Sequence, residues 1–511
     1  MKPSIYNRIC TVLSALWMAF CGIALLVILL FRNRVDYYAK TEPALSTVVV
    51  MFLLAGILSA AYLRTGQKKK STVQAPEIPQ WIILPFSVAL FVLQAVQQYN
   101  IFFLTNWDSS RIVYLATQIA SPDYTGTVSS YLSMYPNNTL LTWLYACLFP
   151  MGTALGLHWA YFVILIQCVL SCIGGWMLFA LAKQLFSVVG ACCVWFVYAV
   201  HIALSPWLGV LYSDPITLCV PIGILYLYDL IQNGRHLPLK WSMVGLIAYV
   251  GYQLKPFSAI AAIAVLLVDL LQMLSQRNKQ QLCRTLVGYA AMVLSVLVLV
   301  VTFGGLVFPS MKVTVDPEAR LGAPHFLMMG LNSSTNGAWD INDVLFSVQQ
   351  PDRAARDAAN LHEATRRLQQ MGLTGLTEHL RNKLLVSFAD GTYAWGQEGD
   401  FYLHILPEPN STLAPFLRNV FYNQGRFYSI WEAFQNLIWY LLLFGSCIGG
   451  FIALRRKECS PTIIALFLSL LGISAYVMIF ESRARYLFIY APVFLLTAAY
   501  SVLPRWQQSN K

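Results

Sequence analysis

Charge is what this sequence has least of. Only 11% of its 511 residues are Asp, Glu, Lys or Arg, while 58% are hydrophobic, and the mean hydropathy is +0.59. A soluble domain carries roughly 25% charged residues, so the composition excludes an ordinary soluble fold. Apolar runs of about 20 residues, each long enough to cross a hydrocarbon core about 30 Å thick, recur along the chain. The sequence therefore predicts an all-α polytopic membrane protein.

Clustered metal ligands are also missing. None of the 11 cysteines lies in the polar stretch 309–430, no CxxC pair has a partner motif, and the 7 histidines form no group with ligand spacing. Neither a zinc site nor a disulfide framework is indicated. The net charge of +11 is attributed to basic residues beside membrane helices, so no nucleic-acid partner is expected. The residues identify no cofactor, and a divalent cation is left open.

The apolar segments give a topology. The first, 9–31, is too long for the core of a signal peptide and is followed by FRNRVDYYAK, so it is interpreted as a retained span. The chain has about 13 spans if every apolar segment crosses; the stretch 137–157 is expected to enter the membrane edge and return, which leaves about 12 spans and both chain termini in the cytosol. Short inner segments then hold 17 basic residues and short outer segments hold 7. The remaining apolar segments are 45–63, 81–104, 159–182, 186–206, 214–232, 241–254, 257–275, 286–308, 430–454, 461–480 and 485–503.

Four regions follow from this topology. Residues 1–80 are expected to hold two transmembrane helices and a cytoplasmic basic linker, and 81–308 to form the transmembrane core with a first outer loop at 105–136. Residues 309–430 are expected to form an extracytoplasmic loop domain and 431–511 the C-terminal transmembrane helices. Two amphipathic helices are predicted in the loop domain, one over 351–371 and one after Gly375, packed against the bilayer surface or the bundle. The first helix shows one apolar face, made of Ala354, Ala358, Leu361 and Leu368.

Two carboxylates lie where apolar sequence meets the outer interface. Asp108 follows IFFLTNW, and Asp214 sits in GVLYSDPITL. Trp107 and the interface would desolvate Asp108 and raise its pKa, a property that suits a general base. Capping of a helix N-terminus is the alternative for both carboxylates. An apolar helical stripe after Asp108 and the Tyr135-Pro136 turn are expected to build a lid around this site.

Three cations occupy similar interfacial positions. Lys255 lies in GYQLKPFSA, while Arg483 and Arg485 lie in ESRARYL. A cation between apolar segments costs a few kcal/mol unless it finds water or an anion. Ammonium and guanidinium groups suit the phosphate of a lipid-linked substrate. Snorkelling toward the lipid headgroups is the alternative.

These features in their order resemble the GT-C superfamily of membrane glycosyltransferases, related to the dolichyl-phosphate-mannose protein mannosyltransferases. The motifs are the acid of the first outer loop, the Tyr-Pro-Asn-Asn turn, the Tyr-Ser-Asp-Pro corner, the outer lysine and the terminal Arg-Tyr corner. The middle, HFLMMGLN…NGAWDIND…LLVSFADGTYAWG, is similar to a bacterial branch known mainly from Gram-positive cells. The resemblance covers roughly residues 81–503.

The resemblance implies a GT-C-like bundle and a sugar donor carried on a polyprenyl phosphate. Asp108 matches the general base and Asp214 a second acid. Lys255 and Arg485 match the cations that bind the lipid phosphate. Further candidates for substrate or lipid-phosphate binding are Arg483, Tyr135, Asn137 and His325. Where many members have two adjacent acids, this chain has Asp108-Ser109, which argues against a paired-carboxylate scheme.

The expected activity is transfer of a hexose, mannose-like, to an extracytoplasmic acceptor: a cell-envelope glycan, a glycolipid or a protein. One base and one departing phosphate imply inversion at the anomeric carbon. The alternatives are a transporter or flippase, which should carry internal repeats and mid-membrane charges, and a polymerase of lipid-linked saccharides. The catalytic loops are expected on the extracytoplasmic face of the cell membrane.

Overall fold

The computed structural model describes residues 5–31, 79–232, 234, 237–276, 279–399, 404–405, 411–456 and 460–502. The predicted span 45–63, the basic linker before residue 79 and both chain termini lie outside the described residues.

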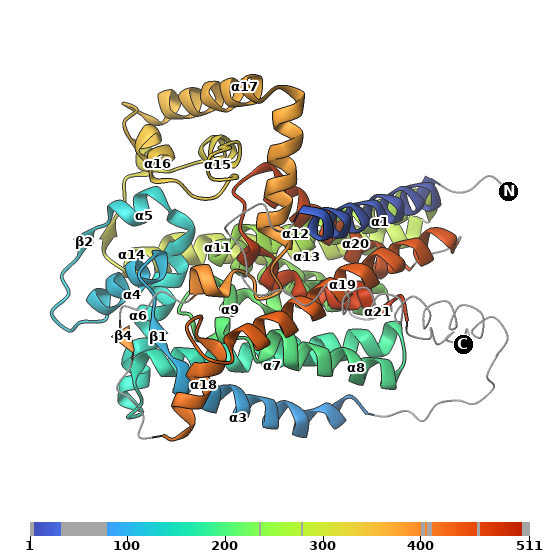
Figure 1. The fold of residues 1–511 in the computed structure, drawn as a ribbon, viewed down its shortest axis with the longest axis horizontal. Coiled ribbons are helices and arrows are strands. Elements are labelled where there is room, and N and C mark those ends of the chain that lie inside the picture. The colour runs from blue at the N-terminus through green and yellow to red at the C-terminus, as the bar shows by residue number, and fades with distance from the viewer. Residues whose placement is uncertain are drawn as a thin grey trace.

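Long apolar helices form the body of the protein. Within the described residues, eight helical segments are long and apolar enough to cross a membrane, and they lie side by side along the long axis of the molecule (Figure 1). Apolar runs become helices in lipid because a helix satisfies all of its own backbone hydrogen bonds. The predicted all-α polytopic architecture is confirmed. These segments are built on α1 (Ile5–Phe31), α3 (Leu84–Ile101), α7 (Trp159–Leu185), α10 (Cys219–Gln232) together with residues 213–218 that precede it in the same span, α12 (Ile260–Gln276), α13 (Lys279–Thr302), α19 (Tyr428–Arg455) and α20 (Pro461–Ile479).

Shorter elements complete the bundle and its ends. Two apolar segments of intermediate length, 188–203 and 484–499, lie below the length of the other spans. The helical elements not yet given are η2 (Gln80–Ile83), α4 (Asp108–Ile119), α5 (Ser130–Met134), η3 (Pro136–Asn138), α6 (Thr139–Ala154), α8 (Val188–Tyr198), η4 (Ala199–Ala203), η5 (Pro206–Gly209), α9 (Ser213–Thr217), α11 (Leu237–Leu254), η6 (Pro256–Ala259), η7 (Phe303–Val307), α14 (Phe308–Ser310), η8 (Pro317–Ala319), α15 (Ala323–Gly330), α16 (Ile341–Val348), α17 (Arg353–Phe388), η9 (Trp395–Gly399), α18 (Leu413–Phe421), η10 (Ala484–Tyr490) and α21 (Ala491–Ala499).

Glycines let helices of the bundle approach closely. A Cβ on Gly449 of α19 would stand 2.4 Å from the carbonyl oxygen of Thr497 in α21, and one on Gly450 would stand 3.0 Å from Met18 of α1. Membrane helices pack through such small residues because lipid gives no hydrophobic drive between them. Both α1 and α21, the first and last described helices, therefore pack against α19.

The element expected to return without crossing is α6. It has 16 residues, fewer than the ~20 needed to cross a membrane. Figure 1 shows α4, α5 and α6 together at the left end of the bundle. The stripe expected from the sequence is Ile112, Leu115, Ala116 and Ile119; the first three are buried and Ile119 is half-buried.

The loop domain contains α15, α16 and α17. Helix α17 has 36 residues and is broken at Gly372, whose φ of 56° is left-handed. The predicted break at Gly375 was three residues late, because both glycines interrupt the pattern and only Gly372 adopts the conformation that glycine tolerates. The first half of α17 lies over α15 and α16, farthest from the bundle (Figure 1).

The predicted apolar face of α17 does not pack against the described part of the bundle, and its packing against a bilayer surface stays a prediction. Ala354, Ala358, Leu361 and Leu368 are exposed. The helix instead buries Arg356, Asn360 and Ala364. The cause is hydrogen bonding: Arg356 donates from Nε to the carbonyl oxygen of Ser347 at 3.0 Å and from Nη1 to that of Glu318 at 2.6 Å. These charge-assisted bonds to main-chain carbonyls outweigh the burial of alanines and two leucines.

Two short strand pairs join distant loops at the same end of the bundle. Strand β1 (Phe103–Leu104) pairs antiparallel with β4 (His404–Ile405), and β2 (Thr127–Val128) pairs parallel with β3 (Val313–Thr314). The first outer loop is therefore held against the loop domain, and the polar parts of the chain gather in one place.

Candidate functional site

Charged side chains from five separate segments meet at this end of the bundle. Their segments are the start of α4, the start of α9, the junction of α11 with η6, the π-helix η9, and the corner between α20 and η10. We call this set the charge cluster; its members are Asp108, Asp214, Lys255, Glu398, Glu481, Arg483 and Arg485.

The Asp214 carboxylate and the Lys255 ammonium form a buried ion pair. Oδ1 of Asp214 lies 2.6 Å from Nζ of Lys255, and their side chains are 0% and 5% exposed. The ammonium is surrounded by the rings of Tyr212, Phe257 and Tyr486 at 4.9–5.4 Å. Lys255 therefore does not snorkel toward lipid headgroups. It is held between a carboxylate and aromatic faces, both of which attract a cation.

Neither candidate carboxylate caps a helix. The residue before α9 is Tyr212 and the residue before α4 is Trp107, and neither helix start has a side-chain cap hydrogen bond. Asp108 and Asp214 both lie inside the first turn, where a carboxylate favours the helix dipole. The capping alternative is thus not what the structure contains.

Arg485 is a buried cation with loose contacts. Its Nε lies 3.7 Å from Oδ2 of Asp214 and its Nη1 3.4 Å from Oε2 of Glu398, both longer than the usual 2.7–2.9 Å of a charge-assisted hydrogen bond. Nε has no hydrogen-bond partner among the described residues. The guanidinium carbon stacks 4.3 Å from the ring of Trp107. Arg485 therefore has donor capacity left for an anion.

Arg483 is bound much more tightly. Its Nη1 donates to Oε1 of Glu398 at 2.8 Å and its Nε to Oε1 of Glu481 at 3.0 Å. The other oxygen of Glu481 accepts a hydrogen bond from the Tyr486 hydroxyl at 2.6 Å. Arg483 thus links the corner after α20 to η9, and both its Nε and its Nη1 already have carboxylate partners.

Asp108 has hydroxyl neighbours rather than a close cation. The Tyr212 hydroxyl donates to its Oδ2 at 3.3 Å, and the Tyr131 hydroxyl bonds to the same carboxylate. Burial raises the pKa of Asp108, the charge of Arg485 opposes that rise, and the charge of Glu481 adds to it. The carboxylate is therefore more basic than a solvated aspartate.

Of the other predicted residues, Tyr135 lies beside the charge cluster, whereas Asn137 and His325 make their hydrogen bonds elsewhere. The ring centroid of Tyr135 is 5.5 Å from that of Tyr131, and burial together with the charges of Asp108 and Glu481 raises the pKa of Tyr135. Asn137 donates to Oδ1 of Asn138 at 3.3 Å, and His325 pairs with Ser347 at 2.7 Å between α15 and α16. In the described parts of the chain no ion pair or hydrogen bond joins these last two side chains to the charge cluster.

Glu398 is the site residue that sequence reasoning missed. It follows a strained turn in which Tyr393 and Ala394 both have positive φ, 59° and 61°. Asp390 holds this turn by accepting from the amides of Thr392 at 2.7 Å and Ala394 at 2.9 Å. The Trp107 indole then donates to the Glu398 carbonyl at 2.8 Å. Strained backbone of this kind collects at functional sites, and the only signal in the sequence was the DGTYAWG segment itself.

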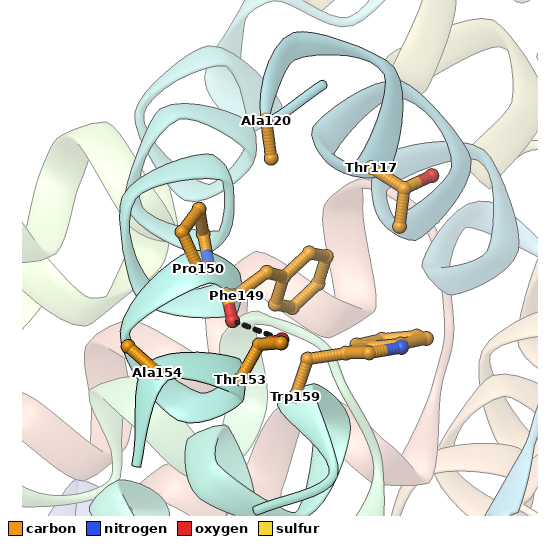
Figure 2. Close-up of a pocket in the computed structure, with 7 residues that line it drawn as sticks. All are labelled: Thr117, Ala120, Phe149, Pro150, Thr153, Ala154 and Trp159. Atoms are coloured by element: carbon orange, nitrogen blue, oxygen red, sulfur yellow. Dashed lines mark hydrogen bonds between the residues drawn. The ribbon is translucent and has the colours of Figure 1, made fainter. Parts of the chain in front are cut away.

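No metal centre is formed by the described residues: they contain no group of three or more His, Cys, Asp or Glu arranged to hold an ion. A hollow of about 450 Å³ lies between the end of α4, the end of α6 and the start of α7, and no member of the charge cluster lines it. Figure 2 shows its mostly apolar lining, in which Phe149, Pro150 and Trp159 face Thr117 and Ala120.

Comparison with known proteins gives one family match. A family model described as "Conserved hypothetical integral membrane protein" matches residues 5–506. No curated protein matches the sequence.

Three solved structures have weak overall similarity. The chain is similar to the archaeal oligosaccharyltransferase AglB from Archaeoglobus fulgidus, in complex with an inhibitory peptide and a dolichol-phosphate, with TM-score 0.42 and 13% identity over 82% of this chain and 50% of that chain. It therefore spans half the length of AglB. It is also similar to ArnT from Cupriavidus metallidurans, with TM-score 0.34 in the apo state (14% identity, 83% of this chain and 77% of that chain) and 0.33 bound to undecaprenyl phosphate (14% identity, 82% and 77%).

Proposed function

Since this chain belongs to the family of conserved hypothetical integral membrane proteins, we propose that it is a membrane glycosyltransferase that moves a sugar from a polyprenyl phosphate to an acceptor hydroxyl. The observation that carries the proposal is the arrangement around Trp107. A basic carboxylate, Asp108, follows it in the chain, and a buried guanidinium with an unbonded Nε, Arg485, stacks on its ring. One group suits proton removal and the other suits a departing phosphate.

The reaction proposed is a single displacement. Asp108 accepts the proton of the acceptor hydroxyl as its oxygen forms a bond to the anomeric carbon. The bond from that carbon to the phosphate oxygen breaks, and its electron pair leaves on the phosphate. Arg485 stabilises the charge that grows there. The product has the inverted configuration at the anomeric carbon.

The partners of the other carboxylates support inversion. A double displacement needs a second carboxylate free to attack the sugar. Asp214 is paired with Lys255 at 2.6 Å, and Glu398 and Glu481 accept from Arg483 at 2.8 and 3.0 Å. Asp108 is the carboxylate of the cluster whose hydrogen-bond partners among the described residues are both hydroxyl groups. It is therefore the best candidate for the base.

Asp214 and Lys255 are proposed to hold Arg485 in position, and Arg485 rather than Lys255 is proposed to make the main contact with the phosphate. The short ion pair occupies the Lys255 ammonium, whereas the contacts of Arg485 are long. Asp214 faces both cations and so fixes their separation. Lys255 then contributes charge at short range, and Arg485 contributes the bidentate donors.

The proposed setting is the extracytoplasmic face of the cell membrane, with both termini in the cytosol. The acceptor is an envelope glycan, a glycolipid or a protein, and a mannose-like hexose is the proposed sugar. The excess of basic residues on the opposite short loops supports this orientation.

A transfer assay tests the proposal. Purified protein in lipid nanodiscs is supplied with polyprenyl-phosphate hexoses and an envelope extract, and radiolabel moved to the extract is measured. Asp108→Asn should lower the transfer rate by about 10²–10⁴-fold, the usual contribution of a general base. Asp123→Asn, which changes an exposed aspartate of the same loop, should leave the rate unchanged. Equal rates for wild type and Asp108→Asn would remove Asp108 as the base.

Two further arms separate the alternatives. A polymerase would use polyprenyl-pyrophosphate saccharides in preference to monophosphates. A flippase would move a labelled lipid-linked saccharide across a vesicle membrane without transfer, and Asp108→Asn would then affect movement rather than bond formation.

A further inference from the structure

We infer that Lys383 of α17 is a positioning residue that fixes the corner carrying Glu481, Arg483 and Arg485. This inference rests on the proposed function, because it assigns to Lys383 the task of orienting Arg485, the proposed phosphate-binding residue. Lys383 does not touch the charge cluster through its side chain. It acts on the main chain from which those side chains extend.

The ammonium of Lys383 bridges two main-chain carbonyls. Its Nζ donates to the Gly330 oxygen at 2.7 Å and to the Phe480 oxygen at 2.6 Å. The side chain is fully buried, with 0% exposed. Gly330 ends α15 and Phe480 follows α20, so one amine joins the loop domain to the residue directly before Glu481.

A second pair of bonds reinforces the same joint. The amide of Ser482 donates to the Gly337 carbonyl at 2.8 Å, and Nε2 of His379, one turn before Lys383 on α17, lies 2.9 Å from the Gly330 oxygen. Residues 480 and 482 are therefore both tied to the loop domain. Glu481 lies between these two bonded residues, and Arg483 follows the second.

The two glycines of the joint have no room for a side chain. A Cβ on Gly330 would stand 2.5 Å from the Ile479 oxygen and 2.6 Å from the Phe480 oxygen. A Cβ on Gly337, whose φ is +78°, would stand 2.9 Å from the Gly330 oxygen and 3.0 Å from Nζ of Lys383. These close approaches are the physical reason for glycine in HFLMMGLN and in NGAWDIND. These two motifs contain no residue that the proposed reaction uses, and the close packing at Gly330 and Gly337 gives them a structural role.

The joint keeps its bonds in either charge state of the amine. Burial lowers the pKa of Lys383 to about 7, and the charge of Glu481 opposes that fall. A charged amine has three N–H donors and a neutral one has two, so both carbonyls stay satisfied. Removing the amine instead leaves the Gly330 carbonyl with His379 alone and takes from the Phe480 carbonyl the bond that ties it to the loop domain, at about 1–3 kcal/mol for an acceptor left unpaired, and it frees the corner to move.

The test measures how strongly the protein prefers a phosphate. Dissociation constants for a polyprenyl phosphate and for the polyprenol of the same length are measured in detergent by microscale thermophoresis, and their ratio is the readout. Wild type should prefer the phosphate. Lys383→Gln should lower this preference roughly tenfold, about 1.4 kcal/mol, because the main chain that carries Arg485 is no longer held in place and its guanidinium no longer faces the phosphate. Arg366→Gln is the matched control: Arg366 lies on the same helix, is half exposed and pairs with Glu363, and its loss should leave the ratio unchanged.

The outcomes are distinguishable. A wild-type protein without preference for the phosphate would overturn the proposed function, and the role of Lys383 with it. A wild-type preference that survives in Lys383→Gln would overturn only the role of Lys383, even if the variant melts at a lower temperature. If Lys383→Gln does not fold, Gly337→Ala decides, since it presses a methyl group against the amine. An unchanged ratio in Gly337→Ala would then reject the inference, and a lowered ratio would support it.

Discussion

The guanidinium carbon of Arg485 lies 4.3 Å from the ring of Trp107, the residue that precedes Asp108 in the chain. A buried cation–π contact of this kind contributes about 2 kcal/mol. The same indole donates to the Glu398 carbonyl at 2.8 Å. One tryptophan therefore sets the distance between the proposed base and the proposed phosphate-binding cation.

Replacing Arg485 by lysine should impair phosphate binding although the charge is kept. An ammonium cannot stack on Trp107 and face both Asp214 and Glu398 as the planar guanidinium does. We expect Arg485→Lys to weaken binding of a polyprenyl phosphate by roughly tenfold or more, with little change for the polyprenol. Arg483→Lys provides the contrast. Its donors already serve Glu398 and Glu481, so thermal stability should fall while the phosphate preference changes less. Equal loss of preference in both variants would contradict the assignment.

The pH dependence of transfer should report the pKa of Asp108. A general base acts when deprotonated, so the rate should rise with pH through the pKa of Asp108, at a midpoint above the ordinary value of 3.8 because burial raises it. The charge of Glu481 adds to that rise. Glu481→Gln removes this charge, and the midpoint should move to lower pH whatever happens to the maximal rate. Asp123→Asn should leave the midpoint in place. A midpoint that moves upward or stays fixed in Glu481→Gln would exclude Asp108 as the titrating base.

Stability should depend more on Asp214 than on Lys255. Asp214→Asn leaves the Lys255 ammonium buried without its 2.6 Å partner, a loss of about 3–5 kcal/mol for a broken buried pair. Lys255→Met is milder, because Arg485 still lies 3.7 Å from Asp214. Melting temperatures in detergent should therefore fall in the order wild type, Lys255→Met, Asp214→Asn. The double variant should be more stable than the sum of the single losses predicts.

Chemical labelling should find the charge cluster on the outside of the cell. Leu373, next to the break in α17, is 83% exposed, and a cysteine there should react with a membrane-impermeant maleimide in intact cells. The native Cys283, exposed near the start of α13, should react only after the membrane is opened. Both are measured in proteins whose other cysteines are replaced by serine. The reverse labelling pattern would reject the proposed orientation.

Much of the charge cluster is visible in the sequence because charge is rare there. In a chain this apolar, a carboxylate or cation at the end of a membrane span needs a partner, and Asp214, Lys255 and Arg485 provide each other with one. Glu398 could not be found in the same way. It lies in the polar stretch 309–430, where a glutamate is unremarkable until the turn at Tyr393 and Ala394 brings it to the arginines.

The face that a helix buries was harder to predict for a related reason. On α17 the apolar pattern of Leu361 and Leu368 indicated one face, while the bonds of Arg356 selected another. Partners distant in sequence decide such cases, and periodicity carries no information about them.

The contact between Trp107 and Arg485 also has a consequence for biosynthesis. Chains emerge from the ribosome N-terminus first, and in the sequence the two residues lie far apart, one before most of the membrane helices and the other after them. Until the final corner has left the translocon, the indole has no guanidinium on its face and Asp214 has one cation instead of two. A nascent or prematurely terminated chain therefore holds no complete site.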